Sequence, residues 1–521
     1  MTYLELRDRA RMAAATLAAV GVAPGDAVLL SGRNHPDWVV AFFGILLAGG
    51  VAVPVDPALS AAEVTNVARA ASVRAAIVDG EAKRDFGEAL EACDAALLDA
   101  AAVTAPGDLS LWDEVERQAG RGQPASPETV ASILFTSGTT GAPKGVMLTH
   151  GNFCALLAAL GRVFDLGPDD RVLSVLPLHH TFEFTCGLLL PLSRGARVAY
   201  LDELSGDALS SALGDGRITA MIGVPALWQL LERRIQAQVH ARGPLFSTAF
   251  DAALELNRML SRTAGLDLGR LLFGVVHAQL GGNIRLLVSG GAALPPETHR
   301  FFGGLGLPLA EGYGLTEASP VLTVAPAGSK AGTVGRPLPG VDLRIAEPDD
   351  DGVGEVQARG PNVMPGYYKN EEATAAALTE DGWLRTGDLG RMDGRGRLKL
   401  VGRAKDVVVT ASGENVHLDD VEQRLGAISG VTEYSLVGLP DPRGGERLGL
   451  LAVPADSETE LGRQAAHTRA RKAIRAAASA LPGWSRPGVV HLVDVPLPRT
   501  ATRKVKRNEV RDVLARIEAA T

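Results

Sequence analysis

Short apolar runs that suit buried strands alternate with helix-like stretches as far as residue 325, and this alternation limits the fold more than any other feature. Such a pattern is typical of α/β domains, in which helices connect the strands of mostly parallel sheets. The chain has 521 residues, which is too many for one hydrophobic core. We therefore expect several α/β subdomains and at least one further domain. The strand-like runs cover residues 27–30, 51–55, 74–78, 171–176, 197–201, 219–224 and 285–289.

The pattern changes twice after residue 325. Residues 333–400 hold short β-rich runs between Gly, Pro and Asp turns, which predicts a small antiparallel or β-barrel-like part. After Gly402 strand-like and helix-like runs mix, which indicates an α+β domain. We therefore predict a large N-terminal domain at 1–402 and a small C-terminal domain at 403–521. The runs expected in the C-terminal domain are strands at 407–409 and 433–438 and helices from about residue 418 and near 462–480.

Charge and cysteine content exclude several classes of protein. The net charge is −8, so the chain lacks the basic field that a nucleic-acid partner requires. Its three cysteines, Cys93, Cys154 and Cys186, have no metal-ligand spacing, and such a sparse, odd set is typical of a reducing compartment. We interpret them as small buried hydrophobic side chains in a cytoplasmic protein.

The N-terminal sequence predicts neither a leader nor a membrane span. Residues 1–22 suit an amphipathic helix and lack the basic and apolar segments of a signal peptide. Residues 38–55 carry no charge, but glycines and Pro54 interrupt them, so we predict a buried helix, a turn and a buried strand. Peripheral association with a membrane surface stays open.

Residues 136–145 read TSGTTGAPKG and follow an apolar run at 131–135 that predicts a buried strand. A strand that opens into a loop of Gly, Ser, Thr and Lys suits a phosphate, because glycines let backbone N–H groups approach anionic oxygens and the lysine adds charge. The spacing differs from a P-loop, since Pro143 precedes Lys144 and Gly145 follows it. Taken alone, the loop could equally be an ordinary surface turn, so its sequence does not decide between the two interpretations.

The longer string TSGTTGAPKGVMLTHGN, residues 136–152, resembles the nucleotide loop of the adenylate-forming superfamily of acyl-CoA synthetases, luciferases and peptide-synthetase adenylation domains. Further segments resemble the same family, so the resemblance covers nearly the whole chain. It implies that 1–402 is an adenylation domain for nucleotide and acyl group, and that 403–521 is a mobile domain. It also implies that ATP contacts Thr136, Ser137, Gly138, Thr139, Thr140, Gly141 and Lys144.

Two segments, of which the first follows a predicted strand, carry the adenine and metal positions of this resemblance. Residues 289–295 read SGGAALP and residues 311–317 read EGYGLTE, and ligands bind at the C-terminal ends of strands in open α/β sheets. The resemblance implies that Thr316 contacts the α-phosphate and that Glu317 holds Mg²⁺, which prefers carboxylate and phosphate oxygens. Taken alone, Glu317 suits an acid at a helix start equally well. The implied adenine-binding residues are Gly290, Gly291, Ala292, Gly312, Tyr313 and Gly314, with the Tyr313 ring stacked on the purine.

His180 lies in LPLHHTF, residues 176–182, which resembles the segment where an aromatic residue or His borders the acyl pocket of the family. A His beside aromatic residues also suits a protein core. The residues alone therefore leave both interpretations open.

Residues 381–390 and 397–403, which read DGWLRTGDLG and RLKLVGR, resemble the signature block of fatty acyl-CoA synthetases. The resemblance implies that Asp388 accepts hydrogen bonds from both ribose hydroxyls and that Arg403 donates nearby. Met392 stands where that block usually has an aromatic residue. Out of this context, Asp388 is a turn residue beside Gly.

Three C-terminal residues have implied roles in the reaction steps. Lys405 occupies the hinge position of the family, Gly413 lines the pantetheine channel, and Lys504 bridges carboxylate and α-phosphate during adenylation. Without the resemblance, Lys405 is a solvated linker charge and residues 499–507 are a basic solvated stretch. Arg503 stands where many relatives carry Gly, and a bulky residue there resembles the long-chain acyl-CoA synthetases.

An extra segment at 233–277 also resembles the long-chain branch. Its amphipathic run has helical spacing and consists of Phe246, Phe250, Leu254, Asn257 and Leu260.

These segments together predict a ligase that uses ATP to convert a medium- or long-chain fatty acid to acyl-AMP and transfers the acyl group to CoA. The resemblance implies ATP, Mg²⁺ and coenzyme A as cofactors and co-substrates, with Lys504, Glu317, Thr316 and His180 in the catalytic site. Two alternatives stay open: a fatty acyl-AMP ligase that loads an acyl carrier protein, and a non-catalytic ligand-binding relative. Loss of Lys504, Glu317 or Asp388 would mark the second alternative, and all three are present.

Overall fold

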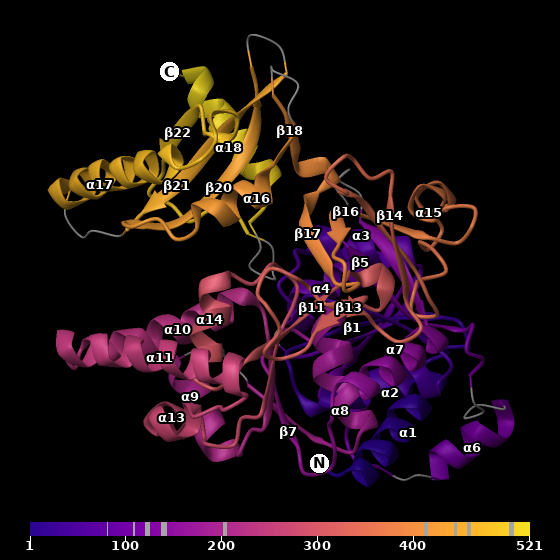
Figure 1. Ribbon diagram of the computed structural model, residues 1–521. Coiled ribbons are helices and arrows are strands. Elements are labelled where there is room, and N and C mark those ends of the chain that lie inside the picture. Colours follow the sequence, from indigo (N-terminus) through magenta and orange to yellow (C-terminus); the bar gives the residue numbers. More distant parts are fainter. Residues whose placement is uncertain are drawn as a thin grey trace. The chain divides into compact units, whose positions relative to one another are not determined.

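The computed structural model describes residues 1–521 except for 81, 108–109, 120–124, 137–142, 202–205, 411–414, 442–444, 456–459, 500–504 and 521. The described chain forms two compact units (Figure 1). The first unit comprises Met1–Leu343 and Ala358–Arg385, and the second comprises Arg344–Gln357 and Thr386–Thr521. The division of the chain between residues 402 and 403 stays a prediction.

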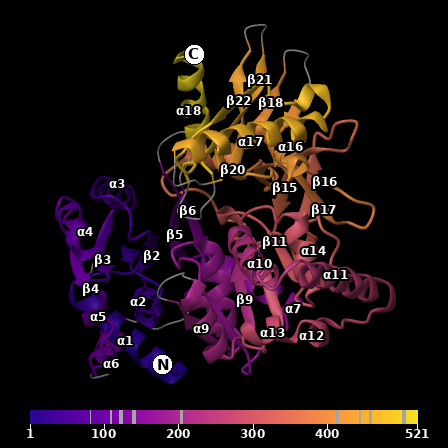
Figure 2. The ribbon, with the colours of Figure 1, turned by 90° about the vertical axis from the view of Figure 1, so that its left-hand side faces the viewer.

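The first unit contains a six-stranded sheet with the order β4-β3-β1-β2-β5-β6. Its neighbouring strands are parallel except for β5 and β6, which form an antiparallel pair. Helices α3 (Ala61–Ala71) and α4 (Ala82–Glu91) cover one face, where Leu29 lies in one apolar cluster with Phe86, and α2 (Pro36–Leu47) contacts β1 and β2 (Figure 2). The strands are β1 (Ala27–Ser31), β2 (Val51–Val55), β3 (Val73–Val78), β4 (Ala96–Asp99), β5 (Val130–Thr136) and β6 (Lys144–Thr149).

The first unit also contains a seven-stranded sheet with the order β13-β12-β11-β10-β9-β7-β8. The run from β8 to β11 is parallel, whereas β12 and β13 are antiparallel additions at the edge. The strands are β7 (Arg171–Ser174), β8 (Arg197–Tyr200), β9 (Ala220–Gly223), β10 (Leu286–Ser289), β11 (Leu309–Tyr313), β12 (Thr323–Ala325) and β13 (Arg336–Pro337).

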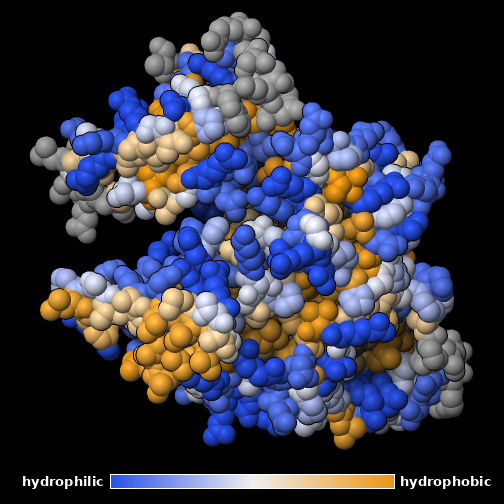
Figure 3. Space-filling model, in the orientation of Figure 1, coloured by the Kyte–Doolittle hydropathy of each residue, from blue (hydrophilic) through white to orange (hydrophobic). Residues whose placement is uncertain are grey.

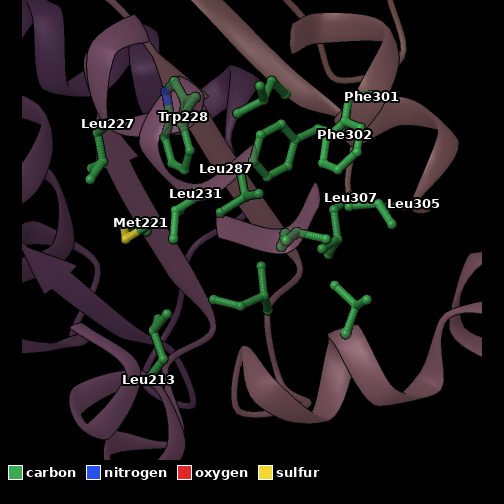
Figure 4. Close-up of a cluster of buried hydrophobic side chains, with 14 of the residues drawn as sticks. Leu213, Met221, Leu227, Trp228, Leu231, Leu287, Phe301, Phe302, Leu305 and Leu307 are labelled. Atoms are coloured by element: carbon green, nitrogen blue, oxygen red, sulfur yellow. The ribbon is translucent and has the colours of Figure 1, made fainter. Parts of the chain in front are cut away.

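Helices cover both faces of the seven-stranded sheet. One face packs into a large apolar core, in which the Trp228 and Phe302 rings meet edge to face with centroids 5.9 Å apart (Figure 4). The opposite face carries α7 (His150–Val163), the π-helix η1 (Glu183–Leu189) and α8 (Leu190–Ser193). The helices around the large core are α9 (Gly206–Gly216), α10 (Pro225–His240), α11 (Pro244–Ala264), α13 (Gly274–Gln279) and α14 (Pro296–Gly304).

The second unit contains three small sheets. A four-stranded sheet has the order β14-β15-β16-β17, β18 pairs with β19, and β20, β21 and β22 form a three-stranded sheet. Apolar clusters lie on both faces of the last sheet, one beneath α16 and the other beneath α18. The elements are β14 (Asp342–Ala346), β15 (Gly354–Arg359), β16 (Leu384–Met392), β17 (Leu398–Arg403), β18 (Val407–Val409), β19 (Asn415–His417), α16 (Leu418–Leu425), β20 (Val431–Pro440), β21 (Glu446–Pro454), α17 (Glu460–Ser479), β22 (Val489–Leu492) and α18 (Arg507–Ala520).

The predicted fold class is confirmed, with parallel-sheet α/β subdomains and a separate C-terminal domain. Residues 38–55 form α2, a turn and β2, as the glycines and Pro54 predicted. The amphipathic run at 246–260 lies in α11, with Phe250 and Asn257 on its buried side. One interpretation was wrong: Cys154 is exposed, because it lies on a solvent-facing position of α7.

No helix in the described part of the chain combines the length and the apolar character that crossing a membrane requires. Exposed large apolar side chains are concentrated around α11 to α13, where Figure 3 shows hydrophobic atoms at the surface. Leu245 is 89% exposed and Leu271 is 80% exposed.

Candidate active site

Three parallel strands end together at the edge of the seven-stranded sheet where the predicted adenine segments lie. In the register of β9, β10 and β11, Ser289 lies between Gly223 and Glu311. Residues 290–292 therefore follow the end of β10, and residues 312–314 lie at the end of the neighbouring β11, where ligands bind in open α/β sheets. The structure brings these two segments together, and their contact with adenine stays a prediction.

Packing requires glycine at three of these positions. A Cβ on Gly290 would lie 2.6 Å from Cζ of Phe182, and a Cβ on Gly314 would collide with the backbone carbonyl of Pro320. Gly291 has a φ of +79°, which is strained for residues with a side chain. The backbone itself therefore forms much of the surface at this edge.

Glu311 fixes the loop that follows β10. Its carboxylate accepts a hydrogen bond of 3.2 Å from the backbone N–H of Leu294. Burial raises the pKa of Glu311 to about 7, and the Leu294 hydrogen bond opposes the shift. The sequence analysis did not single out this residue, although an acid inside an apolar strand-like run was the available signal.

A second contact joins the predicted acyl segment to the predicted α-phosphate segment. The Thr181 hydroxyl donates to the Thr316 hydroxyl over 3.2 Å. Two residues that are far apart in sequence therefore lie side by side at the same end of the sheet.

Tyr367 links the predicted metal residue to the predicted phosphate loop. Its hydroxyl donates to Oε1 of Glu317 over 2.8 Å, and Nζ of Lys144 lies 5.4 Å from its ring centroid. Burial and the Glu317 carboxylate raise the pKa of Tyr367, so the hydroxyl remains a donor at neutral pH. The partly buried Glu317 carboxylate suits Mg²⁺, which proteins often hold with one or two carboxylates and substrate phosphates. Sequence reasoning missed Tyr367, because an aromatic pair beside Gly366 reads as a surface turn.

The two ends of the predicted phosphate loop are close together. Thr136 at the end of β5 and Lys144 at the start of β6 are partners in the antiparallel register. Several residues assigned to the loop and to the reaction lie outside the described residues, so their roles stay predictions: Ser137, Gly138, Thr139, Thr140, Gly141, Gly413 and Lys504.

His179 and His180 form a partly buried pair of neutral rings. The ring centroids lie 4.3 Å apart, and Nε2 of His179 is 3.7 Å from Oδ2 of Asp56. Burial lowers the pKa of His179 to about 3 and also lowers that of His180. Both rings are therefore uncharged at pH 7, and a border position for His180 beside the acyl pocket stays a prediction.

A narrow apolar cavity lies on the α7 and η1 side of the seven-stranded sheet. Val288 and Gly312 contribute to its wall just before the strand ends, and Phe182 contributes from the segment that also carries His180. Every lining side chain is apolar: Leu160, Phe164, Leu166, Val172, Phe182, Cys186, Leu190, Ala220, Met221, Ile222, Leu286, Val288, Gly312, Val321 and Val324.

A buried acid, Glu183, begins the π-helix beside this cavity. Both carboxylate oxygens are fully buried and make no hydrogen bond of normal length to a described residue. Burial raises the pKa of Glu183 to about 8, although the Ser174 hydroxyl and the backbone N–H groups of Leu176 and Val175 lie near enough to oppose the shift. The space is tight, because a Cβ on Gly187 would collide with the carboxylate. Glu183 is therefore a neutral carboxylic acid at pH 7.

Asp388 and Arg403 meet in the second unit. They are partners in the antiparallel register of β16 and β17, and Nε of Arg403 lies 3.2 Å from Oδ1 of Asp388. Lys405 follows in a short 3-10 turn at Ala404–Asp406, where burial and then Arg403 lower its pKa. The structure thus brings the predicted ribose-binding pair together, and the ribose contact stays a prediction.

Comparison with known proteins gives consistent matches. The model of the AMP-binding enzyme family matches residues 1–368, and that of the AMP-binding enzyme C-terminal domain matches residues 420–504. A feruloyl-CoA synthase of an Amycolatopsis species is 32% identical over 520 residues, which cover 98% of this chain and 93% of the relative. A long-chain-fatty-acid–CoA ligase of Mycobacterium bovis is 31% identical over 465 residues, which cover 85% and 76% of the two chains. ATP-bound MatB from Rhodopseudomonas palustris has a TM-score of 0.77 at 26% identity, with 99% of this chain and 94% of that chain covered.

We predict that Glu183→Gln raises the free energy of unfolding at pH 8 but changes it little at pH 4.5. The folded state keeps the Glu183 acid protonated up to about pH 8, whereas the unfolded chain ionises it near 4.5. Ionisation therefore stabilises the unfolded wild-type chain as the pH rises between these values, which lowers the free energy of unfolding by an amount on the order of 5 kcal/mol. Denaturant unfolding across pH 4.5–8 would show a steeper loss of stability for wild type than for the variant. The exposed Glu88→Gln is the control and should keep the wild-type slope. Equal slopes for all three proteins would contradict the neutral state of Glu183.

Proposed function

This chain belongs to the AMP-binding enzyme family, and on that premise we propose that its acid substrate is a medium- or long-chain fatty acid. The protein is an AMP-forming acyl-CoA ligase: it uses ATP to convert a carboxylic acid to acyl-AMP and then transfers the acyl group to CoA. The names of the two relatives state different acids, an aromatic one and a long-chain fatty one. The choice of acid must therefore be argued from the residues of this chain.

The apolar cavity is the observation that carries the proposal. Its lining residues are all apolar, so a phenolic hydroxyl or a ketone buried there would find no strong hydrogen-bond partner among them. An alkyl chain has no such requirement, and its burial is favoured in proportion to its apolar area. The lining thus supports a fatty acid over an acid with polar groups along its length.

The position of the cavity suits an acid that reacts at the sheet edge. Val288 and Gly312 line the cavity, and the next residues along the chain, Ser289 and Tyr313, end β10 and β11. An alkyl chain in the cavity would place its carboxylate toward the segments predicted to bind the nucleotide.

The first step must bring two anions together, the carboxylate and the α-phosphate of ATP. No general base is required, because a carboxylic acid is already ionised at pH 7. We assign the electrostatic support to Lys504 and to Glu317, which would hold Mg²⁺ while Tyr367 orients its carboxylate. When bound, Mg²⁺ would neutralise phosphate charge.

The second step needs a thiol at the acyl-AMP, and Lys504 serves only the first step in this assignment. We propose that the C-terminal domain turns about Lys405 between the steps, so that Lys504 leaves and the CoA thiol enters. Domain motions of this kind gate many enzymes. An acyl carrier protein stays the alternative acceptor, because it requires the same adenylation residues.

We predict that Gly312→Val shortens the acids that the enzyme accepts. A Cβ at this position has room, since its nearest neighbours lie 3.9 and 4.0 Å away, but the extra methyl groups of Val would enter the cavity. The variant should lose roughly tenfold or more in kcat/KM for palmitate and keep hexanoate activity within about twofold. Gly312→Ala is the matched control, with wild-type behaviour expected for both acids.

The measurement is acid-dependent ATP–pyrophosphate exchange with fatty acids of rising length, ferulate and indoleacetate. Ferulate as the best substrate of wild type would overturn the fatty-acid proposal. Acyl transfer to a holo acyl carrier protein but not to CoA would show that the carrier protein, and not CoA, is the acyl acceptor.

We predict that Lys504→Ala blocks adenylation but spares thioester formation from supplied acyl-AMP. Loss of an oriented charge beside a developing anion typically costs about 10²–10³ in rate. Pyrophosphate exchange and acyl-CoA formation from synthetic acyl-AMP measure the two steps separately. A similar loss in both steps would refute the assigned role.

A further inference from the structure

Arg507 lies at the centre of a cluster of three carboxylates in the second unit. Its Nη1 is 3.2 Å from Oδ2 of Asp406, and its Nη2 is 2.5 Å from both Oδ1 of Asp419 and Oε2 of Glu422. The Arg507 side chain is only 17% exposed. Burial disfavours its charge, but Glu422 and Asp419 outweigh that effect and raise its pKa. One guanidinium thus holds three acids from two chain segments, the turn at Ala404–Asp406 and α16.

The cluster is anchored in the core of the second unit. Oε1 of Glu422 accepts the backbone N–H of Leu436 in β20 over 2.7 Å, while Oε2 binds Arg507. Glu422 itself lies in α16, whose Val421 and Leu425 pack into an apolar cluster with Leu436. The guanidinium is therefore fixed to the sheet and not to a mobile surface chain.

One arm of the cluster reaches the proposed hinge. Asp406 is the last residue of the 3-10 turn that contains Lys405. Lys405, Asp406 and Arg507 also line one polar hollow of the second unit, which has an empty volume of about 380 Å³.

The other arm reaches the segment that carries Lys504. Arg507 begins α18 three residues after Lys504, and the backbone N–H of Lys506 donates to the carbonyl of Pro498 over 2.8 Å. Arg499 and Val505 form an isolated β-bridge, and Arg499 pairs with Glu433 of β20. Ion pairs to the sheet and to α16 therefore hold the chain on both sides of residues 500–504.

We propose that Arg507 is a positioning residue that ties the hinge segment and the Lys504 segment to one rigid core, so that both move as a single body. The proposal rests on the proposed roles of Lys405 and Lys504. With Asp406 held by Arg507, rotation at the hinge is confined to the residues before 406. The same contact fixes the start of α18, which lies three residues after Lys504 in the sequence.

The test compares both half-reactions in full-length variants. Arg507→Gln should lower kcat for adenylation and for thioester formation by roughly 10–100-fold each, because small misplacements of reacting groups have effects of this size. KM for ATP and acid should change little. The kcat values of Arg507→Lys should fall between those of wild type and Arg507→Gln, since a single ammonium group cannot replace a planar guanidinium with several donors. Wild-type rates in both steps for a folded Arg507→Gln variant would overturn the proposal.

Two further variants separate positioning from stability. Arg447→Gln removes a different arginine–carboxylate pair, which joins β21 to α18 through Arg447 and Glu518 at 2.8 Å. This variant should keep the wild-type rates of adenylation and of thioester formation. Asp406→Asn removes the charge of the hinge arm, which weakens its contact with Arg507, and leaves the pairs with Asp419 and Glu422. It should slow thioester formation while the melting temperature stays near that of Arg447→Gln.

If Arg507→Gln does not fold, the Asp406→Asn variant alone tests the proposal. A wild-type rate of thioester formation in that variant would overturn the proposed tie between the hinge segment and the core. The Lys504→Ala variant shows separately whether the proposed catalytic role of Lys504 is correct. If Lys504→Ala leaves adenylation intact, the catalytic assignment fails, whereas the Asp406→Asn rate still reports on the hinge arm.

Discussion

The parallel register of β9, β10 and β11 is the constraint on which the candidate site depends. It sets Gly223, Ser289 and Glu311 side by side at one edge of the sheet. Because side chains alternate between the faces of a strand, Leu287 enters the helix-covered core while Val288 lines the cavity. One arrangement of backbone thus forms both the sheet edge and the wall of the apolar cavity.

The sequence predicted the fold best where a strand is buried on both faces. Residues 51–55 coincide with β2, because all five side chains are buried and leave a continuous apolar run. The prediction was too short for β20, which extends from Val431 to Pro440 instead of 433–438. At its start the register shifts between Val431 and Glu433, and at its end the pairing with β21 continues to Pro440, which is opposite Glu446. The shift interrupts the alternation of side chains by which a strand is recognised in the sequence.

The sequence indicated which segments belong to the candidate site, but it did not indicate which side chains in them contact each other. The Asp388 and Arg403 pair and the meeting of Thr181 with Thr316 both join residues from segments that the resemblance had marked. Tyr367 was missed because its partner Glu317 lies fifty positions earlier, and local periodicity carries no information on such a pair. Glu183 was missed as well, although an acid inside an apolar run was the available signal there too.

The π-helix has a consequence for how the cavity can change. A π-turn holds one more residue than an α-turn, so η1 is equivalent to an α-helix with an inserted residue. Deletion of one residue within Glu183–Leu189 would restore α-helical pairing in the turn, while the segments on either side, including the cavity-lining Leu190, would keep their orientation. The side chains of the turn itself, among them the cavity-lining Cys186, would be redistributed around the helix axis. A change in chain length at this point therefore alters the lining of the apolar cavity locally, together with the surroundings of the buried Glu183 acid.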